Sequence, residues 1–135
     1  MNPIDFLKTI YLGDRGCTKI VIDNDHSIIK FQIDLISRIR SQSGYWEYYQ
    51  DENLEEGCIV ISSIESFTMN SKGLLPNDCI KSLEAKKIEG RDVWEFTFKI
   101  NAVAKNLPLR SEEVEIIVVA ESIHLEKKDG IKMTG

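Results

Sequence analysis

The sequence predicts a mainly β domain: an antiparallel β-sandwich or partly open barrel of about seven or eight strands, with one N-terminal helix packed on it. Three observations predict this fold. Apolar residues repeat at helical spacing only over residues 2–12, and from Cys17 onward they alternate with a period of two. Turn-forming residues separate the alternating segments. Too few helical segments occur between strands for the crossovers of a parallel sheet. Residues 1–135 fit a single domain.

Residues 2–12 are predicted to form the helix. Asn2 can cap its N-terminus, Pro3 suits the first helical position, and Gly13 ends the run. One helical face carries apolar side chains at a spacing of three to four, namely Ile4, Leu7, Ile10 and Tyr11. Because this face must be buried, we expect the helix to lie on a sheet.

The first strands follow a turn-rich region. A β-rich run covers residues 18–23, and an Asn- and Asp-rich turn leads into a strand in which apolar and polar residues alternate from Ile29 to Leu35. The alternation changes phase at Ile36, which predicts a bulge or bend. Further strands are expected over residues 45–49 and 59–67.

The C-terminal half contains one ambiguous segment. Residues 76–89 could form a helix or a strand, and the turn-like residues 89–92 favour a strand over about 82–89. Residues 93–102 alternate clearly. Residues 113–125 are apolar on both faces, which is typical of a strand in the middle of a sheet or under the helix. Residues 127–135 are polar and are expected to form a flexible tail.

Composition excludes several kinds of partner. Seventeen basic and 22 acidic residues give a net charge of −5, which disfavours nucleic acid and anionic membrane surfaces. Three cysteines without a CxxC pair make a disulfide framework or a zinc site improbable. No secretory signal or membrane-spanning run is evident, so a cytoplasmic protein is expected. The sequence fits a monomer or a homodimer equally.

Catalytic motifs are not apparent. His26 lies in an acidic turn with Asp23 and Asp25, where carboxylates usually bond to backbone amides rather than to a metal. Ser122, His124 and Glu126 share one face of the last predicted strand, but residues two apart on a strand are too distant for a catalytic triad. Glu112, Glu113 and Glu115 are expected to be exposed with ordinary acidity. We therefore predict no catalytic residue, no metal site and no cofactor.

The most distinctive segment runs from Tyr45 to Glu56. It contains four aromatic and five acidic residues and no Lys or Arg. In one interpretation Trp46 and Tyr48 are core residues and the carboxylates solvate a turn. In the other, aromatic area beside charge of one sign forms a partner-binding surface. The residues assigned to that surface are Tyr45, Tyr49, Asp51, Glu52, Glu55 and Glu56.

Four segments carry a family resemblance: residues 4–17, 32–40, 44–49 and 121–126. Together they resemble a family of small, uncharacterised bacterial proteins that look like the immunity proteins of polymorphic toxin systems. The resemblance spans nearly the whole chain and brings no catalytic motif with it. It implies a class by analogy, and no functional residue is carried over from it.

These observations predict a non-enzymatic binding protein. The leading hypothesis is an immunity-type protein that neutralises a cognate bacterial toxin by direct binding, with a basic surface on the toxin meeting the acidic edge. The alternative is a β-sandwich module that binds a small ligand or forms part of an assembly, which an apolar pocket or a free strand edge would favour. An enzyme that uses surface carboxylates is a third hypothesis.

Overall fold

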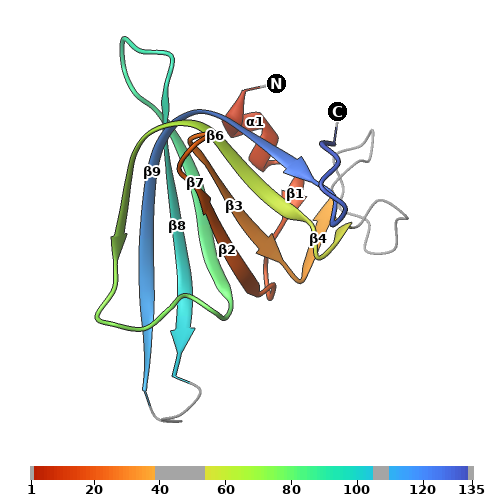
Figure 1. Ribbon diagram of the computed structural model, residues 1–135, viewed down its shortest axis with the longest axis vertical. Coiled ribbons are helices and arrows are strands. Elements are labelled where there is room, and N and C mark those ends of the chain that lie inside the picture. Colours follow the sequence, from red (N-terminus) through yellow and green to blue (C-terminus); the bar gives the residue numbers. More distant parts are fainter. Residues whose placement is uncertain (1, 39–53, 105–109, 134–135) are drawn as a thin grey trace.

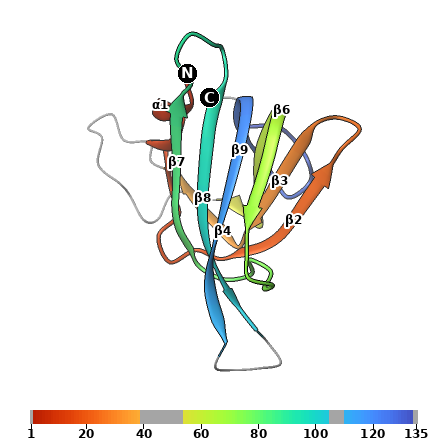
Figure 2. The ribbon, with the colours of Figure 1, turned by 90° about the vertical axis from the view of Figure 1, so that its left-hand side faces the viewer.

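The computed structural model describes residues 2–38, 54–104 and 110–133. These residues form one short helix and nine strands arranged in two antiparallel sheets (Figures 1 and 2). The elements are α1 (Pro3–Leu7), β1 (Ile10–Tyr11), β2 (Cys17–Asp23), β3 (Ile28–Ile33), β4 (Leu35–Arg38), β5 (Leu54–Glu55), β6 (Cys58–Asn70), β7 (Ile80–Lys87), β8 (Trp94–Val103) and β9 (Ser111–Glu126). The predicted fold class is confirmed: a mainly β chain in which two antiparallel sheets pack together.

The larger sheet has the strand order β2-β3-β6-β9-β8-β7, and the smaller has the order β1-β4-β5. In the described part of the chain, the two edge strands of the larger sheet meet at a single point. There the Cys17 amide donates to the Asp78 carbonyl at 3.0 Å and the Ile80 amide donates to the Arg15 carbonyl at 2.8 Å. Beyond this point β2 and β7 diverge, so the sheet is strongly curved and is not closed into a barrel.

The curvature is concentrated in β6 and β9, which both arch across the top of Figure 1. The β6–β9 register shifts between Ile64 and Ser66, and Ser63 has a φ of 56°. A bulge of this kind bends a strand and increases its twist. The bend turns the half of the sheet built on β2 and β3 to face the half built on β7 and β8.

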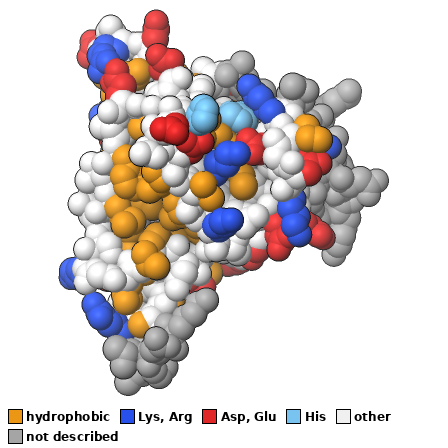
Figure 3. Space-filling view, viewed as in Figure 1, with side chains coloured by type: hydrophobic (Ala, Val, Ile, Leu, Met, Phe, Trp, Pro, Cys, Tyr) orange, Lys and Arg blue, Asp and Glu red, His pale blue; other side chains and the backbone are white. Residues whose placement is uncertain are grey.

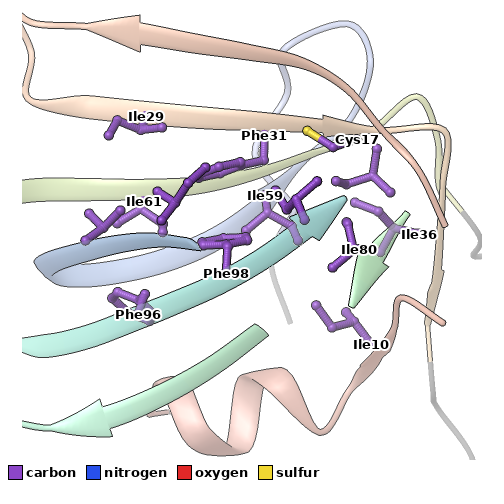
Figure 4. Close-up of a cluster of buried hydrophobic side chains, with 14 of the residues drawn as sticks. Ile10, Cys17, Ile29, Phe31, Ile36, Ile59, Ile61, Ile80, Phe96 and Phe98 are labelled. Carbon is purple, nitrogen blue, oxygen red and sulfur yellow. The ribbon is translucent and has the colours of Figure 1, made fainter. Parts of the chain in front are cut away.

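The core fills the space between these two halves (Figure 4). Phe31 of β3 stacks on Phe98 of β8, with ring centroids 4.0 Å apart and planes 18° apart. Ile10 of β1, Ile36 of β4 and Leu54 of β5 belong to the same buried cluster. The small sheet therefore covers one end of the core rather than forming a core of its own.

The N-terminal helix is shorter than predicted. Asn2 caps it as expected, with its side-chain oxygen accepting from the Asp5 amide at 2.8 Å. However, α1 ends at Leu7, and Ile10 pairs with Arg38 in the small sheet. The apolar stripe therefore does not lie on one helix face, because Ile4 is exposed while Ile10 is buried in the sheet. Pairing with β4 replaces the last helical turn.

The strand predictions agree with the structure where it describes them. The ambiguous segment contains a strand, β7, and a tight turn joins it to β8. The central strand predicted over residues 113–125 is β9, which lies between β6 and β8. The phase change before Ile36 marks the step from β3 to β4, which belong to different sheets. The strand predicted over residues 45–49 lies outside the described residues.

The segment predicted to be a flexible tail contains a turn. The Lys127 amide donates to the Ile131 carbonyl and the Met133 amide donates to the Leu125 carbonyl, both at 2.9 Å. Residues 127–133 thus fold back beside the end of β9. Within the ranges that the structure describes, no helix is long and apolar enough to cross a membrane.

Candidate partner-binding surface

Two of the six residues assigned to the binding surface are described by the structure. Glu55 ends β5, Glu56 follows it in a turn, and both are exposed, as the hypothesis requires. The other four, Tyr45, Tyr49, Asp51 and Glu52, lie outside the described residues, as do Trp46 and Tyr48. The aromatic part of the surface therefore remains a prediction.

The backbone around these two carboxylates is tied to both sheets. Glu55 pairs with Leu35 in the small sheet. The Glu56 amide donates to the Asp34 carbonyl at 3.0 Å, and the Gln32 side-chain amide donates to the Glu56 carbonyl at 3.3 Å. Glu56 adopts a φ of 54°, a left-handed conformation typical of a tight turn. The carboxylates thus project from a corner whose backbone is held in place.

The corner turns directly into β6 through Gly57. A Cβ atom at Gly57 would lie 2.9 Å from Leu54 Cβ and 3.2 Å from the Glu126 carbonyl oxygen. The chain can therefore pass between β5 and the end of β9 only because this residue has no side chain. The close passage brings Glu55 and Glu56 beside the C-terminal turn.

This contact changes the charge of the surface. Lys128 forms an ion pair with Glu56, and the pKa of Lys128 is raised chiefly by its hydrogen bond to that carboxylate. Lys127, Lys128 and Asp129 also line a shallow depression with Leu54 and Glu55. Residues 45–56 include no Lys or Arg, but the fold places Lys127 and Lys128 next to Glu55 and Glu56.

A second group of polar side chains lies nearby, on the face of the large sheet that points away from the core. Lys30 Nζ donates to Glu126 Oε1 at 2.6 Å, and His124 Nε2 lies 3.8 Å from Glu126 Oε2. Cys58 is paired with Glu126 across β6 and β9. Figure 3 shows side chains of both signs and histidine together on this side of the molecule. We call Lys30, Cys58, His124 and Glu126 the outer-face cluster.

The outer-face cluster is built around a nearly buried carboxylate. Glu126 is only 8% exposed, and its charge is balanced by Lys30. Burial lowers the pKa of His124 and raises the pKa of Cys58. A nucleophilic thiol needs a lowered pKa, so the arrangement at Cys58 is the reverse of an activated cysteine. The side chains of the cluster link the three strands β3, β6 and β9, and this arrangement fits a structural role.

Sequence analysis found only part of this cluster. It placed Ser122, His124 and Glu126 on one face of the last strand, and the strand register confirms that arrangement. It missed Lys30, which is 96 residues from Glu126 in the chain. Only the strand order β3-β6-β9 brings the two together. A polar residue in an alternating strand gives no sign of which distant strand will face it.

The remaining candidate residues are separate from the predicted surface. His26 contacts Asp23 in the β2–β3 turn, with Nδ1 3.0 Å from Oδ2, and hydrogen bonds from His26 lower the pKa of Asp23. In the parts of the chain that the structure covers, no three His, Cys, Asp or Glu side chains are grouped as metal ligands would be. His26 and Asp23 therefore cap a turn.

Glu112 and Glu113, at the start of β9, line an open cleft with Lys72 and Arg110. Backbone hydrogen bonding by the Lys72 amide, whose nitrogen lies 2.7 Å from Glu112 Oε1, is the main cause of the lowered pKa of Glu112. A carboxylate acting as a general acid needs a raised pKa instead. Glu115 points to Asn70, with an oxygen–nitrogen distance of 3.4 Å.

Comparison with known proteins gives one match. Residues 1–134 match the model of a protein family described as "Family of unknown function (DUF6258)". No curated protein and no solved structure matches the chain.

Proposed function

The chain belongs to this family of unknown function, and we propose that it is a non-enzymatic binding protein of the immunity type, which neutralises a cognate bacterial toxin by direct binding. The partner would meet the surface formed by Tyr45, Tyr49 and the carboxylates from Asp51 to Glu56. The observation that carries the proposal is the exposure of Glu55 and Glu56, which end the acidic segment that follows the aromatic run in sequence.

The geometry of the corner supports such a role. Because the backbone of Glu55 and Glu56 is paired with the strands around it, docking there requires little ordering of the chain, and this favours affinity. Glu55 has its carboxylate on the surface, and its pairing with Leu35 is made through the backbone. A basic surface on the partner would be attracted to it during approach.

The ion pair between Lys128 and Glu56 refines the proposal. Lys128 reduces the negative field at Glu56, and a partner lysine or arginine would have to compete with it. Glu55 is therefore the described residue whose charge should matter most for association. An exposed ion pair of this kind is weak, so exchanging Lys128 for a partner cation costs little free energy.

The test begins with the partner. A toxin-like protein encoded beside this gene should bind the chain in a one-to-one complex, and coexpression of the chain should restore growth to cells that make the toxin. Glu55→Lys should then reduce the association rate several-fold at about 10 mM salt, and much less at about 150 mM salt, where screening is stronger. Glu84→Lys is the matched control, because Glu84 is an exposed glutamate on β7.

Two results would count against the proposal. If neighbouring genes encode no protein that binds the chain, the toxin-neutralising role is unsupported. If Glu55→Lys and Glu84→Lys change association equally, the binding surface lies elsewhere.

One observation favours the alternative of an assembly or ligand-binding module. An apolar cleft of about 210 Å³ opens between the β2–β3 hairpin and the end of β6, with Ile22, Ile28 and Phe67 among its lining residues. The cleft lies beside a strand edge that has no neighbour in the described strands.

A further inference from the structure

The C-terminal part of β6 has an open side. β3 pairs with β6 only as far as the Ile28–Ser62 pair, whereas β9 continues to the Asn70–Glu115 pair. Among the described strands, residues 66–70 therefore have a neighbour on one side only. All of them are exposed. The unpaired amide and carbonyl groups on the open side can accept another strand.

This edge lacks the features that usually prevent strand pairing. Protein edges are commonly protected by charged residues, by proline or by a covering helix. The β7 edge carries Lys81, Lys86 and Lys87, and it also contacts α1. Residues 66–70 read Ser-Phe-Thr-Met-Asn, without charge or proline. In a chain with a net charge of −5, this is a neutral strand edge.

The same edge exposes apolar side chains. Phe67 is 37% exposed and Met69 is 41% exposed. They share a sheet face with Val118 and Ile116 of β9, so they extend the core-facing surface beyond the region that the β2–β3 hairpin covers. Apolar side chains gather on the left of the face in Figure 3, where Figure 1 places the end of β6. Phe67 also forms one wall of the apolar cleft, opposite Ile22 of the hairpin.

We propose that this edge binds a second copy of the chain, through antiparallel pairing of residues 66–70 about a two-fold axis at Thr68. This register places Phe67 opposite Met69 of the other copy, and Met69 opposite its Phe67, on the apolar face. It also places Thr68 opposite Thr68, and Ser66 opposite Asn70, on the polar face. Aromatic–sulfur contacts and hydrogen bonds between hydroxyl and amide groups are favourable cross-strand pairs.

Self-pairing fits the edge because the segment is complementary to itself in this register. Each apolar residue meets an apolar residue and each polar residue meets a polar one, and no like charges are opposed within the segment. A two-fold axis requires complementarity of this kind. Five paired residues bury less area than a stable dimer usually does, so we expect weak association that depends on protein concentration.

This inference is independent of toxin binding. Glu55 and Glu56 precede the start of β6, whereas the proposed contact uses its end. The two associations also respond differently to salt. Binding of a basic partner weakens as salt rises, but two copies that each carry −5 repel one another less at high salt, so the dimer should become stronger.

Sedimentation equilibrium of the full chain, from about 10 μM to about 1 mM, should show a monomer–dimer equilibrium. Thr68→Lys places two like charges at the two-fold axis and should raise the dissociation constant at least tenfold (about 1.4 kcal/mol). Because Thr68 is exposed, the variant should keep the far-UV circular dichroism of the native chain. Thr18→Lys is the control, since Thr18 is an exposed threonine on β2, an edge strand of the same sheet.

Thr68→Cys gives a second test that does not depend on weakening the contact. In the proposed register, a short bis-maleimide reagent should join position 68 of one copy to position 68 of the other, as located by mass spectrometry. Thr18→Cys should not form the corresponding product. A native chain that stays monomeric throughout the concentration range would overturn the proposal. So would a dimer that Thr18→Lys weakens and Thr68→Lys does not, or one in which position 68 never cross-links to itself.

Discussion

The stacked pair of Phe31 and Phe98 should be a major stabilising contact between the two halves of the curved sheet. Both rings are fully buried, and their centroids are 4.0 Å apart. Replacing Phe98 by Ala removes a buried ring and leaves a cavity, which costs about 3–5 kcal/mol. For a domain of this size that corresponds to a decrease of roughly 10–18 °C in melting temperature. It is a large part of the 5–15 kcal/mol that usually separates folded from unfolded states.

Phe98→Leu distinguishes the contribution of ring stacking to stability from the contribution of side-chain volume. It keeps an apolar side chain in the core and loses the ring contact, so we expect a smaller cost of about 1–2 kcal/mol. Phe67→Ala makes the same chemical change as Phe98→Ala at a side chain that is 37% exposed, and should cost about 1 kcal/mol.

Urea unfolding followed by far-UV circular dichroism measures all three variants. The protein should be kept at a few micromolar, so that self-association does not contribute to the free energy of unfolding. If Phe98→Ala destabilises the protein no more than Phe67→Ala does, the stack does not hold the two halves together, and the description of the core is wrong.

Two further predictions concern the outer-face cluster. Glu126→Gln should lower the free energy of unfolding by about 1–2 kcal/mol, because Lys30 loses a partner that is nearly buried, whereas Glu84→Gln on the exposed face of β7 should change it little. His124 should contribute to the pH dependence of stability. Since burial lowers its folded-state pKa, the unfolded chain binds the proton more readily, and stability should fall as the pH drops through the ordinary value of 6.5. His124→Gln should reduce this fall between pH 7.5 and 5.5 in urea titrations, and parallel curves for the two proteins would contradict the argument.

The strands could be predicted from sequence because their apolar and polar residues alternate. In β8, for example, the side chains of Phe96, Phe98 and Ile100 are buried between more exposed neighbours. β9 could be placed in the middle of the sheet because Ile117 and Val119 make its second face apolar too. These patterns are local in sequence. They predict the structure because successive residues of a strand point to opposite faces, so alternation shows directly which face is buried.

The end of the helix could not be predicted in the same way. Ile10 fits the spacing of a helical stripe, but its partner Arg38 lies 28 positions later and belongs to a strand that sequence analysis did not separate from β3. The spacing of apolar residues shows that a side chain is buried, but not which element buries it. Tertiary pairing of Ile10 and Tyr11 therefore overrode a favourable helical pattern.

Only those features of the candidate surface that depend on residue type could be predicted from the sequence. The exposure of Glu55 and Glu56 followed from their charge. The ion pair with Lys128 did not, because it depends on the position of the turn after β9. The lack of charge in residues 66–70 could likewise be seen in the sequence. Its significance required knowing that the pairing of β3 with β6 stops at the Ile28–Ser62 pair.

The central position of β9 has a consequence for how the chain is made. Synthesis reaches residues 111–126 only after β6 and β8 are complete, and each of those strands needs β9 as a neighbour. Until β9 leaves the ribosome, the nascent chain presents two more open strand edges and a divided set of apolar side chains. Folding of the large sheet therefore has to wait for β9, and the interval before β9 emerges is when the nascent chain is most exposed to aggregation and most dependent on chaperones.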